Sequence, residues 1–160
     1  MSKPMAKEAQ FISPDAYPQM LSRQDAAQAM KSLRSSQTMV KAQAAMEAAI
    51  PPMKQAILQY VDELEAVGND MPKVFDKVHE IRGFAETAGM VTTGRIAEIL
   101  CRYMDDMNRL DKAADTHLVA LHVSAIARAA RAEDDDVRLG QVVAAELAAL
   151  VARKLASTTR

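Results

Sequence analysis

Apolar side chains recur every three or four residues along most of the chain, and this spacing favours helices over strands. The clearest case lies near residue 80, where Val74, Val78, Ile81, Ala85 and Ala88 fall within one narrow arc at 100° per residue. No segment alternates apolar and polar residues with a period of two, as a half-buried strand would. Alanine, methionine and leucine supply the apolar content, and only 4% of residues are aromatic, which is a helix-forming mixture. The sequence therefore predicts an all-α fold.

Prolines, glycines and capping residues divide this pattern into six predicted helices. Pro51 and Pro52 are expected to end or kink the first helix, because proline lacks the amide donor and clashes with the preceding turn. Short connections between amphipathic helices favour antiparallel neighbours. We therefore expect an antiparallel up-down four-helix bundle with additional helices at both ends. The expected parts are a loose N-terminal lead-in over residues 1–22, a helix over 23–50, the bundle over 53–131 and a C-terminal helix over 136–156.

Charge and composition exclude several classes of function. The formal net charge is −1 and no basic stripe appears, so nucleic acid is not expected as a partner. No apolar run reaches the length of a membrane span, and the first residues lack the apolar core of a signal peptide. A single cysteine excludes an intramolecular disulfide. These features are typical of a cytoplasmic protein that does not bind membranes.

One helical segment combines a histidine, a cation and a glycine on the same face. Arg82 and Gly83 follow His79 by three and four residues, which places both beside it one turn further along. His79 itself lies outside the apolar arc of this helix, so we expect it to face solvent or the edge of the bundle. A glycine within a helix costs about 1 kcal/mol relative to alanine, so its presence needs a reason. Room for a bulky group at the imidazole is one such reason, with Arg82 placed to meet a negative charge.

These residues resemble the signature of histidine-containing phosphotransfer (HPt) domains. That signature has a histidine, an aliphatic residue two later, Lys or Arg three later, Gly four later, a small residue six later and often Gly ten later. The segment His79-Glu-Ile81-Arg82-Gly83-Phe-Ala85-Glu-Thr-Ala-Gly89 meets each of these positions. The next helix contains Cys101-Arg-Tyr-Met104-Asp105, which is similar to the family's Cys-x-x-Leu-Glu, with Met for Leu and Asp for Glu. The resemblance covers about residues 53–131.

The resemblance implies a phosphorelay function in bacterial two-component signalling. It makes His79 the phospho-acceptor, Arg82 the charge partner of the phosphoryl group and Gly83 the residue that gives steric access. The implied partners are response-regulator receiver domains and a hybrid sensor histidine kinase. The receiver would bring the Mg²⁺, so the chain is expected to need no cofactor or metal of its own. Such a protein is a phosphocarrier and not an enzyme with its own turnover.

Some residues depart from the family pattern and suggest an alternative. Phe84 stands where many members have a small residue, and Glu86 returns to the face of the histidine, where its carboxylate would repel a phosphoryl group. Glu80 adds a second carboxylate nearby. Phe75, Phe84, Glu86 and Met90 are the residues we expect to dock a partner. The alternative function is an HPt-like adaptor that binds a receiver domain or a kinase without transferring phosphate.

Other interpretations remain open from the sequence. One alternative is that His79 is an ordinary surface residue without a function. Another is that Gly83 allows close helix packing and has only a structural role. His117 and His122 are five residues apart and do not share a helix face, which disfavours a metal site with Cys101 or Asp105. The first and last predicted helices either cover the bundle or pair with a second copy to form a homodimer.

Overall fold

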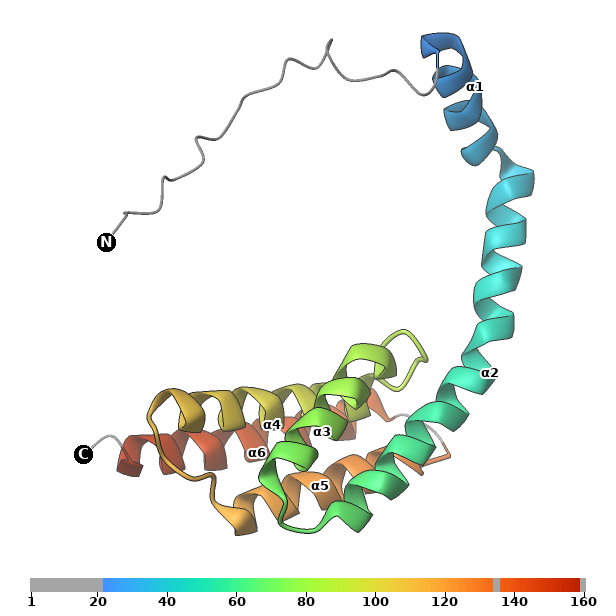
Figure 1. Ribbon diagram of the computed structural model, residues 1–160. Coiled ribbons are helices and arrows are strands. Elements are labelled where there is room, and N and C mark those ends of the chain that lie inside the picture. The colour runs from blue at the N-terminus through green and yellow to red at the C-terminus, as the bar shows by residue number, and fades with distance from the viewer. Residues whose placement is uncertain (1–21, 134–135, 159–160) are drawn as a thin grey trace, which may run out of the picture. The chain divides into compact units, whose positions relative to one another are not determined.

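The computed structural model describes residues 22–133 and 136–158, and over these residues the chain is entirely helical (Figure 1). No strand occurs among them, so the all-α prediction is confirmed. Residues 1–21 of the expected lead-in lie outside the described residues. The chain divides between Ala44 and Ala45 into two compact units. The helices are α1 (Arg23–Leu33), α2 (Ser36–Val67), α3 (Met71–Ala85), α4 (Val91–Arg109), α5 (Thr116–Ala130) and α6 (Val137–Thr158).

The prediction of one helix over residues 23–50 is wrong, because the helix breaks within this range and the second helix continues beyond its end. The chain leaves the helical path after Leu33, and Ser35 restarts it by accepting a hydrogen bond from the backbone N–H of Thr38 at 3.2 Å. The new helix, α2, then continues through Pro51 and Pro52 to Val67. Each proline removes one backbone hydrogen bond, but the turns on both sides remain helical. The expected boundary at residues 50–53 therefore does not exist.

The unit from Ala45 onward contains the hydrophobic core, and α4 lies at its centre. This helix packs against α3, α5 and α6. The last turns of α2 contribute Ile57, Val61 and Leu64 to the same core, and α6 contributes Leu147. Glycines with positive φ allow the reversals that follow α2 and α3, at Gly68 (φ +66°) and Gly89 (φ +77°).

Polar contacts at the helix ends and between helices hold this arrangement in register. The backbone N–H of Asp115 donates to the buried Tyr103 hydroxyl at 2.8 Å, which fixes the start of α5 against α4. The Asp115 carboxylate also pairs with Lys154 of α6 at 2.6 Å. On the other side, Arg131 reaches the Asp62 carboxylate of α2 at 2.7 Å. The salt bridges are partly exposed, so each contributes little to stability, whereas the Tyr103 hydrogen bond is partly buried.

His122 is a fully buried histidine of α5 and makes folding sensitive to pH. Its Nδ1–H donates to the carbonyl oxygen of Leu118 at 2.8 Å, and its buried Nε2 has no partner among the described residues. Burial lowers the pKa of His122 below its usual value of 6.5. Because the folded pKa is lowered, the neutral ring stabilises the fold above about pH 6.5. As the pH falls below that value, the unfolded chain binds a proton that the folded chain resists.

We therefore expect the free energy of unfolding to decrease as the pH falls from about 7 to 5, with a slope of up to about 1.4 kcal/mol per pH unit from this residue. Urea unfolding at several pH values in that window measures the slope. His122→Leu is the comparison, because an apolar side chain leaves no buried nitrogen to protonate. Equal slopes for the two proteins would contradict the assignment.

Candidate functional site

Helix α3 places His79 on its solvent side because the opposite side of the helix is buried in the core. Val74, Val78 and Ile81 are completely buried, as the apolar arc predicted. His79 is exposed, and its ring contacts Phe75 with centroids 6.0 Å apart and planes tilted by 33°. Among the described residues, no hydrogen bond or ion pair engages the imidazole. The ring is therefore open to a reactant from outside.

Gly83 leaves empty space one turn after the histidine. A Cβ atom built on this residue would have nothing within 4 Å, and the residue is exposed. The interpretation that Gly83 permits close helix packing is therefore wrong. What the missing side chain provides is free volume at the surface beside His79.

Arg82 carries a positive charge next to the histidine. Its side chain is half-buried, and no carboxylate of the described residues forms an ion pair with it. The guanidinium acts on the Cys101 thiol of α4, but burial outweighs that charge and raises the pKa of Cys101 to about 11. Cys101 is therefore a packed, protonated residue and not a nucleophile. Arg82 keeps its hydrogen-bond donors available for an anion.

The carboxylates around the site differ in their surroundings. Glu80 forms an ion pair with Lys77 at 3.4 Å, and Lys77 also contacts Glu63 of α2 at 2.7 Å. The hydrogen bond to Glu63 is the main reason that the pKa of Lys77 is raised. Glu80 is thus partly neutralised, and it lines a shallow depression together with His79. Glu86 is exposed and has no cationic partner among the described residues.

One acidic neighbour was missed from the sequence. Asp76 precedes His79 by three residues, so the two share a face, and both line one shallow depression. Asp76 is exposed and forms no ion pair within the described residues. Its position three residues before the histidine is the signal that would have identified it. The same depression is also lined by Lys73, Lys77 and Glu80, so the charges around His79 are of both signs.

The expected docking residues do not all lie beside the histidine. Phe75 does, since it contacts the ring of His79. Phe84 is 50% exposed, but it follows His79 by five residues and so lies across the helix. Met90 was expected to be exposed, and this is wrong because it is only 7% exposed. Its backbone N–H donates to the Ala85 carbonyl at 2.8 Å, which folds the chain tightly between α3 and α4 and turns Met90 into the core.

The remaining histidines form no second site with the cysteine. His117 is exposed at the start of α5, whereas His122 is buried in the core. The described residues contain no cluster of three or more His, Cys, Asp or Glu side chains arranged to hold a metal ion. Nor does any helix in the described part of the chain combine the length and apolar content needed to cross a membrane.

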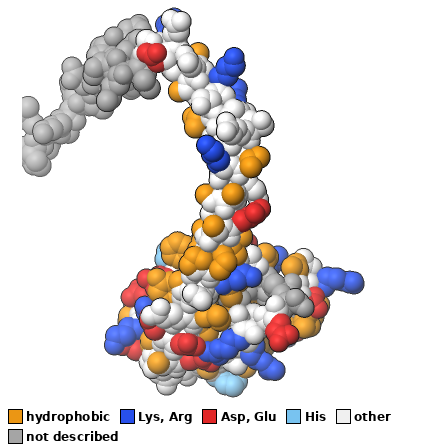
Figure 2. Space-filling model, turned by 90° about the vertical axis from the view of Figure 1, so that its right-hand side faces the viewer, with side chains coloured by type: hydrophobic (Ala, Val, Ile, Leu, Met, Phe, Trp, Pro, Cys, Tyr) orange, Lys and Arg blue, Asp and Glu red, His pale blue; other side chains and the backbone are white. Residues whose placement is uncertain are grey.

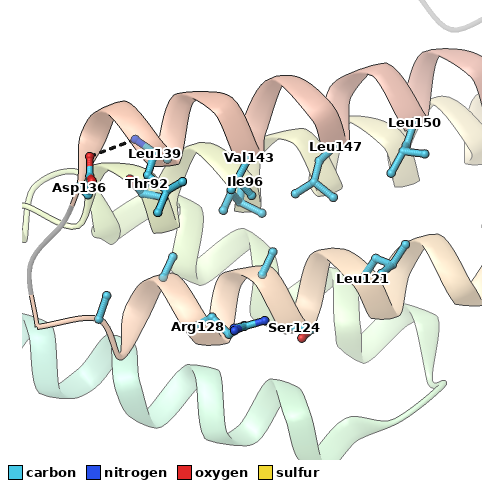
Figure 3. Close-up of a pocket in the computed structure, with 14 residues that line it drawn as sticks. Thr92, Ile96, Leu121, Ser124, Arg128, Asp136, Leu139, Val143, Leu147 and Leu150 are labelled. Atoms are coloured by element: carbon cyan, nitrogen blue, oxygen red, sulfur yellow. Dashed lines mark hydrogen bonds between the residues drawn. The ribbon is translucent and has the colours of Figure 1, made fainter.

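A second concavity lies away from the histidine, between α5 and α6, with α4 beneath it (Figure 3). Its volume is about 500 Å³, and its walls are mainly apolar. Leu139, Val143 and Leu147 of α6 point into it from one side, and Leu121 and Arg128 of α5 border the other. None of the residues predicted to carry function lines this groove.

The combination on α3 is an accessible imidazole, a guanidinium without an ion-pair partner among the described residues, and an open space, with the carboxylates of Asp76 and Glu86 nearby. Comparisons with known proteins found no family model that matches the chain, and no match among curated proteins or solved structures.

Proposed function

We propose that the protein is a phosphotransfer intermediary in which His79 accepts a phosphoryl group from a receiver-domain aspartate and passes it to another. In this proposal the second half of α2 together with α3, α4 and α5 forms an HPt-like four-helix bundle, to which α6 is added. The observation that carries the proposal is the exposed and unpaired ring of His79, with Arg82 and the open space at Gly83 one turn away.

The chemistry needs few groups from this chain. A neutral imidazole nitrogen attacks the phosphorus of an aspartyl phosphate, the bond between phosphorus and the carboxylate oxygen breaks, and a phosphorus–nitrogen bond forms. The transferred group brings about two negative charges, which a guanidinium can bind through paired hydrogen bonds. Arg82 is the residue placed for this, and the free volume at Gly83 admits the partner's active site. The receiver supplies the Mg²⁺ that neutralises charge during transfer.

The direct test is labelling of the purified protein by phosphorylated receiver domains. Receivers carrying radioactive phosphate are mixed with the full chain, and the products are separated and treated with acid or base. Phosphohistidine is expected to appear on the chain as a label that acid removes and base does not. Failure to label with a complete set of receivers from the same cell would contradict the proposal.

Two carboxylates on the helix of His79 favour a second candidate, a docking adaptor that binds receivers without accepting phosphate. Asp76 and Glu86 are exposed, and neither has a cationic partner among the described residues. Both carboxylates repel an incoming phosphoryl group but attract a basic surface on a partner. A receiver that binds the chain tightly, yet never transfers label to it, would identify this function.

Gly83→Ala distinguishes the effect of this glycine on the stability of the fold from its effect on access to His79. Since a Cβ at this position meets nothing within 4 Å, alanine is expected to raise the free energy of unfolding by about 1 kcal/mol. The same methyl group narrows the space beside His79, so the rate of labelling is expected to fall. Urea unfolding and labelling kinetics measure the two effects. A variant that is more stable and labels at the normal rate would show that access does not depend on this position.

A further inference from the structure

The concavity between α5 and α6, called the α5–α6 groove below, leaves apolar side chains in contact with water. Leu139 on one wall is 60% exposed, and Leu121 on the other wall is 41% exposed. Ile96 of α4 lies at the floor, so the groove is apolar throughout its depth (Figure 3). Along α6 the lining extends from Leu139 to Leu150, which corresponds to about 17 Å of helix. A ligand that covered these walls would bury apolar surface and gain free energy from it.

The size of the α5–α6 groove suits a small molecule with one narrow chain. On the side of α5 the lining includes Ala125 and Ala129, so small side chains face the leucines of α6, and the space between them is about 500 Å³. This volume lies within the range of about 300–1,000 Å³ that is typical of small-molecule sites. A helix of the same length and about 10 Å in diameter would occupy on the order of 1,300 Å³. The groove is therefore too narrow to take in the helix of a protein partner.

One cation borders the apolar lining. Arg128 of α5 is exposed and forms no ion pair within the described residues. Asp136, the acidic residue of the lining, is engaged at the start of α6, where its carboxylate accepts hydrogen bonds from the backbone N–H groups of Arg138 and Leu139, each at 3.0 Å. A guanidinium binds a carboxylate through two parallel hydrogen bonds. The groove is therefore complementary to an apolar chain that carries an anionic head.

The charges also indicate which anion fits and where it comes from. A carboxylate carries one negative charge, whereas a phosphate monoester carries about two, and Asp136 would repel the second. On the face shown in Figure 2, cationic, acidic and apolar side chains are interspersed over the compact unit. Binding to an anionic membrane surface instead uses lysines and arginines gathered together. These features favour a carboxylic acid that is free in solution.

We propose that the α5–α6 groove binds a single-chain carboxylic acid of the fatty-acid class. The apolar chain lies between the walls that carry Leu121 and Leu139, and the carboxylate binds Arg128. The proposal is independent of phosphoryl transfer, because none of the lining residues belongs to α3.

Calorimetric titration of the full chain with decanoate, below the concentration at which decanoate forms micelles, tests the proposal. The wild type is expected to bind decanoate about tenfold or more tightly than decanol, which has the same chain but no charge to pair with the guanidinium. Arg128→Gln is expected to remove this preference. The matched control is Arg95→Gln, which also removes one positive charge from an exposed helical position but lies outside the groove. This control is expected to keep the preference.

Ala129→Leu tests the position of the chain. The larger side chain fills part of the groove and is expected to weaken the binding of decanoate and of decanol by similar factors, while urea unfolding verifies that the variant is folded. A wild-type chain that does not bind decanoate, or that binds the acid and the alcohol equally, would overturn the proposal. So would loss of the preference in Arg95→Gln, or unchanged affinity in a folded Ala129→Leu protein. Binding to vesicles of anionic lipid without binding to free decanoate would replace the proposed ligand with a membrane surface.

Discussion

Replacing His79 with glutamine is expected to abolish acid-labile labelling by phosphorylated receivers and to leave the fold intact. Glutamine has no nucleophilic ring nitrogen, so no phosphorus–nitrogen bond can form. The imidazole is exposed and makes no hydrogen bond with the described residues, so its loss is expected to change the free energy of unfolding by less than about 0.5 kcal/mol. Labelling assays and urea unfolding of the same preparation give the two results.

His117→Gln is the matched control for this variant. His117 is also an exposed histidine at a helical position, but it lies on α5 and far from Arg82 in the sequence. This control is expected to label at the wild-type rate. Labelling that persists in His79→Gln, or that disappears in His117→Gln, would show that the phospho-acceptor is a residue other than His79.

Replacing Gly140 with alanine is expected to lower the free energy of unfolding by about 1–3 kcal/mol, because the added methyl group has no space. Gly140 is buried where α6 crosses the start of α4, and a Cβ there would lie 2.1 Å from Oγ1 of Thr92 and 2.9 Å from its Cβ. Rotation of the threonine side chain moves the first atom but not the second. The two helices therefore have to separate for the fold to accept the alanine.

Urea unfolding measures this loss, and Gly83→Ala provides the comparison within the same chain. The two substitutions add the same methyl group to a helical glycine, yet the expected effects have opposite signs. A Gly140→Ala protein as stable as the wild type would mean that α6 does not approach α4 as closely as described.

The features of α3 could be predicted from the sequence because they depend on one helix alone. The apolar arc fixed which side is buried, and the position of His79 outside that arc predicted its exposure correctly. The reason for Gly83 could not be chosen from the sequence, since it depends on whether a neighbouring helix lies against it. Gly140 shows the opposite case. It also lies within a helix, but there the missing side chain leaves room for Thr92 of α4.

The predictions from sequence were wrong where local helix preferences compete with tertiary packing. Pro51 and Pro52 predicted a helix end or a kink, and the end was placed at residue 50. The buried face from Ile57 onward instead belongs to the same continuous helix as the residues before the prolines. The break near Ser35 depends on a hydroxyl that caps the next helix, and the alanine-rich sequence around it concealed that signal. Met90 was expected to dock a partner, which requires an exposed side chain. The tight turn after Ala85 instead directs this side chain inward.

The placement of α6 separates this helix from the site on α3. This helix packs on α4 and α5, while His79 stands on the outward side of α3. Substitutions on the outward side of α6 are therefore expected to leave the surroundings of His79 unchanged. The outward residues of α6 can vary without disturbing the site on α3, as long as Gly140 is retained where α6 meets Thr92 of α4.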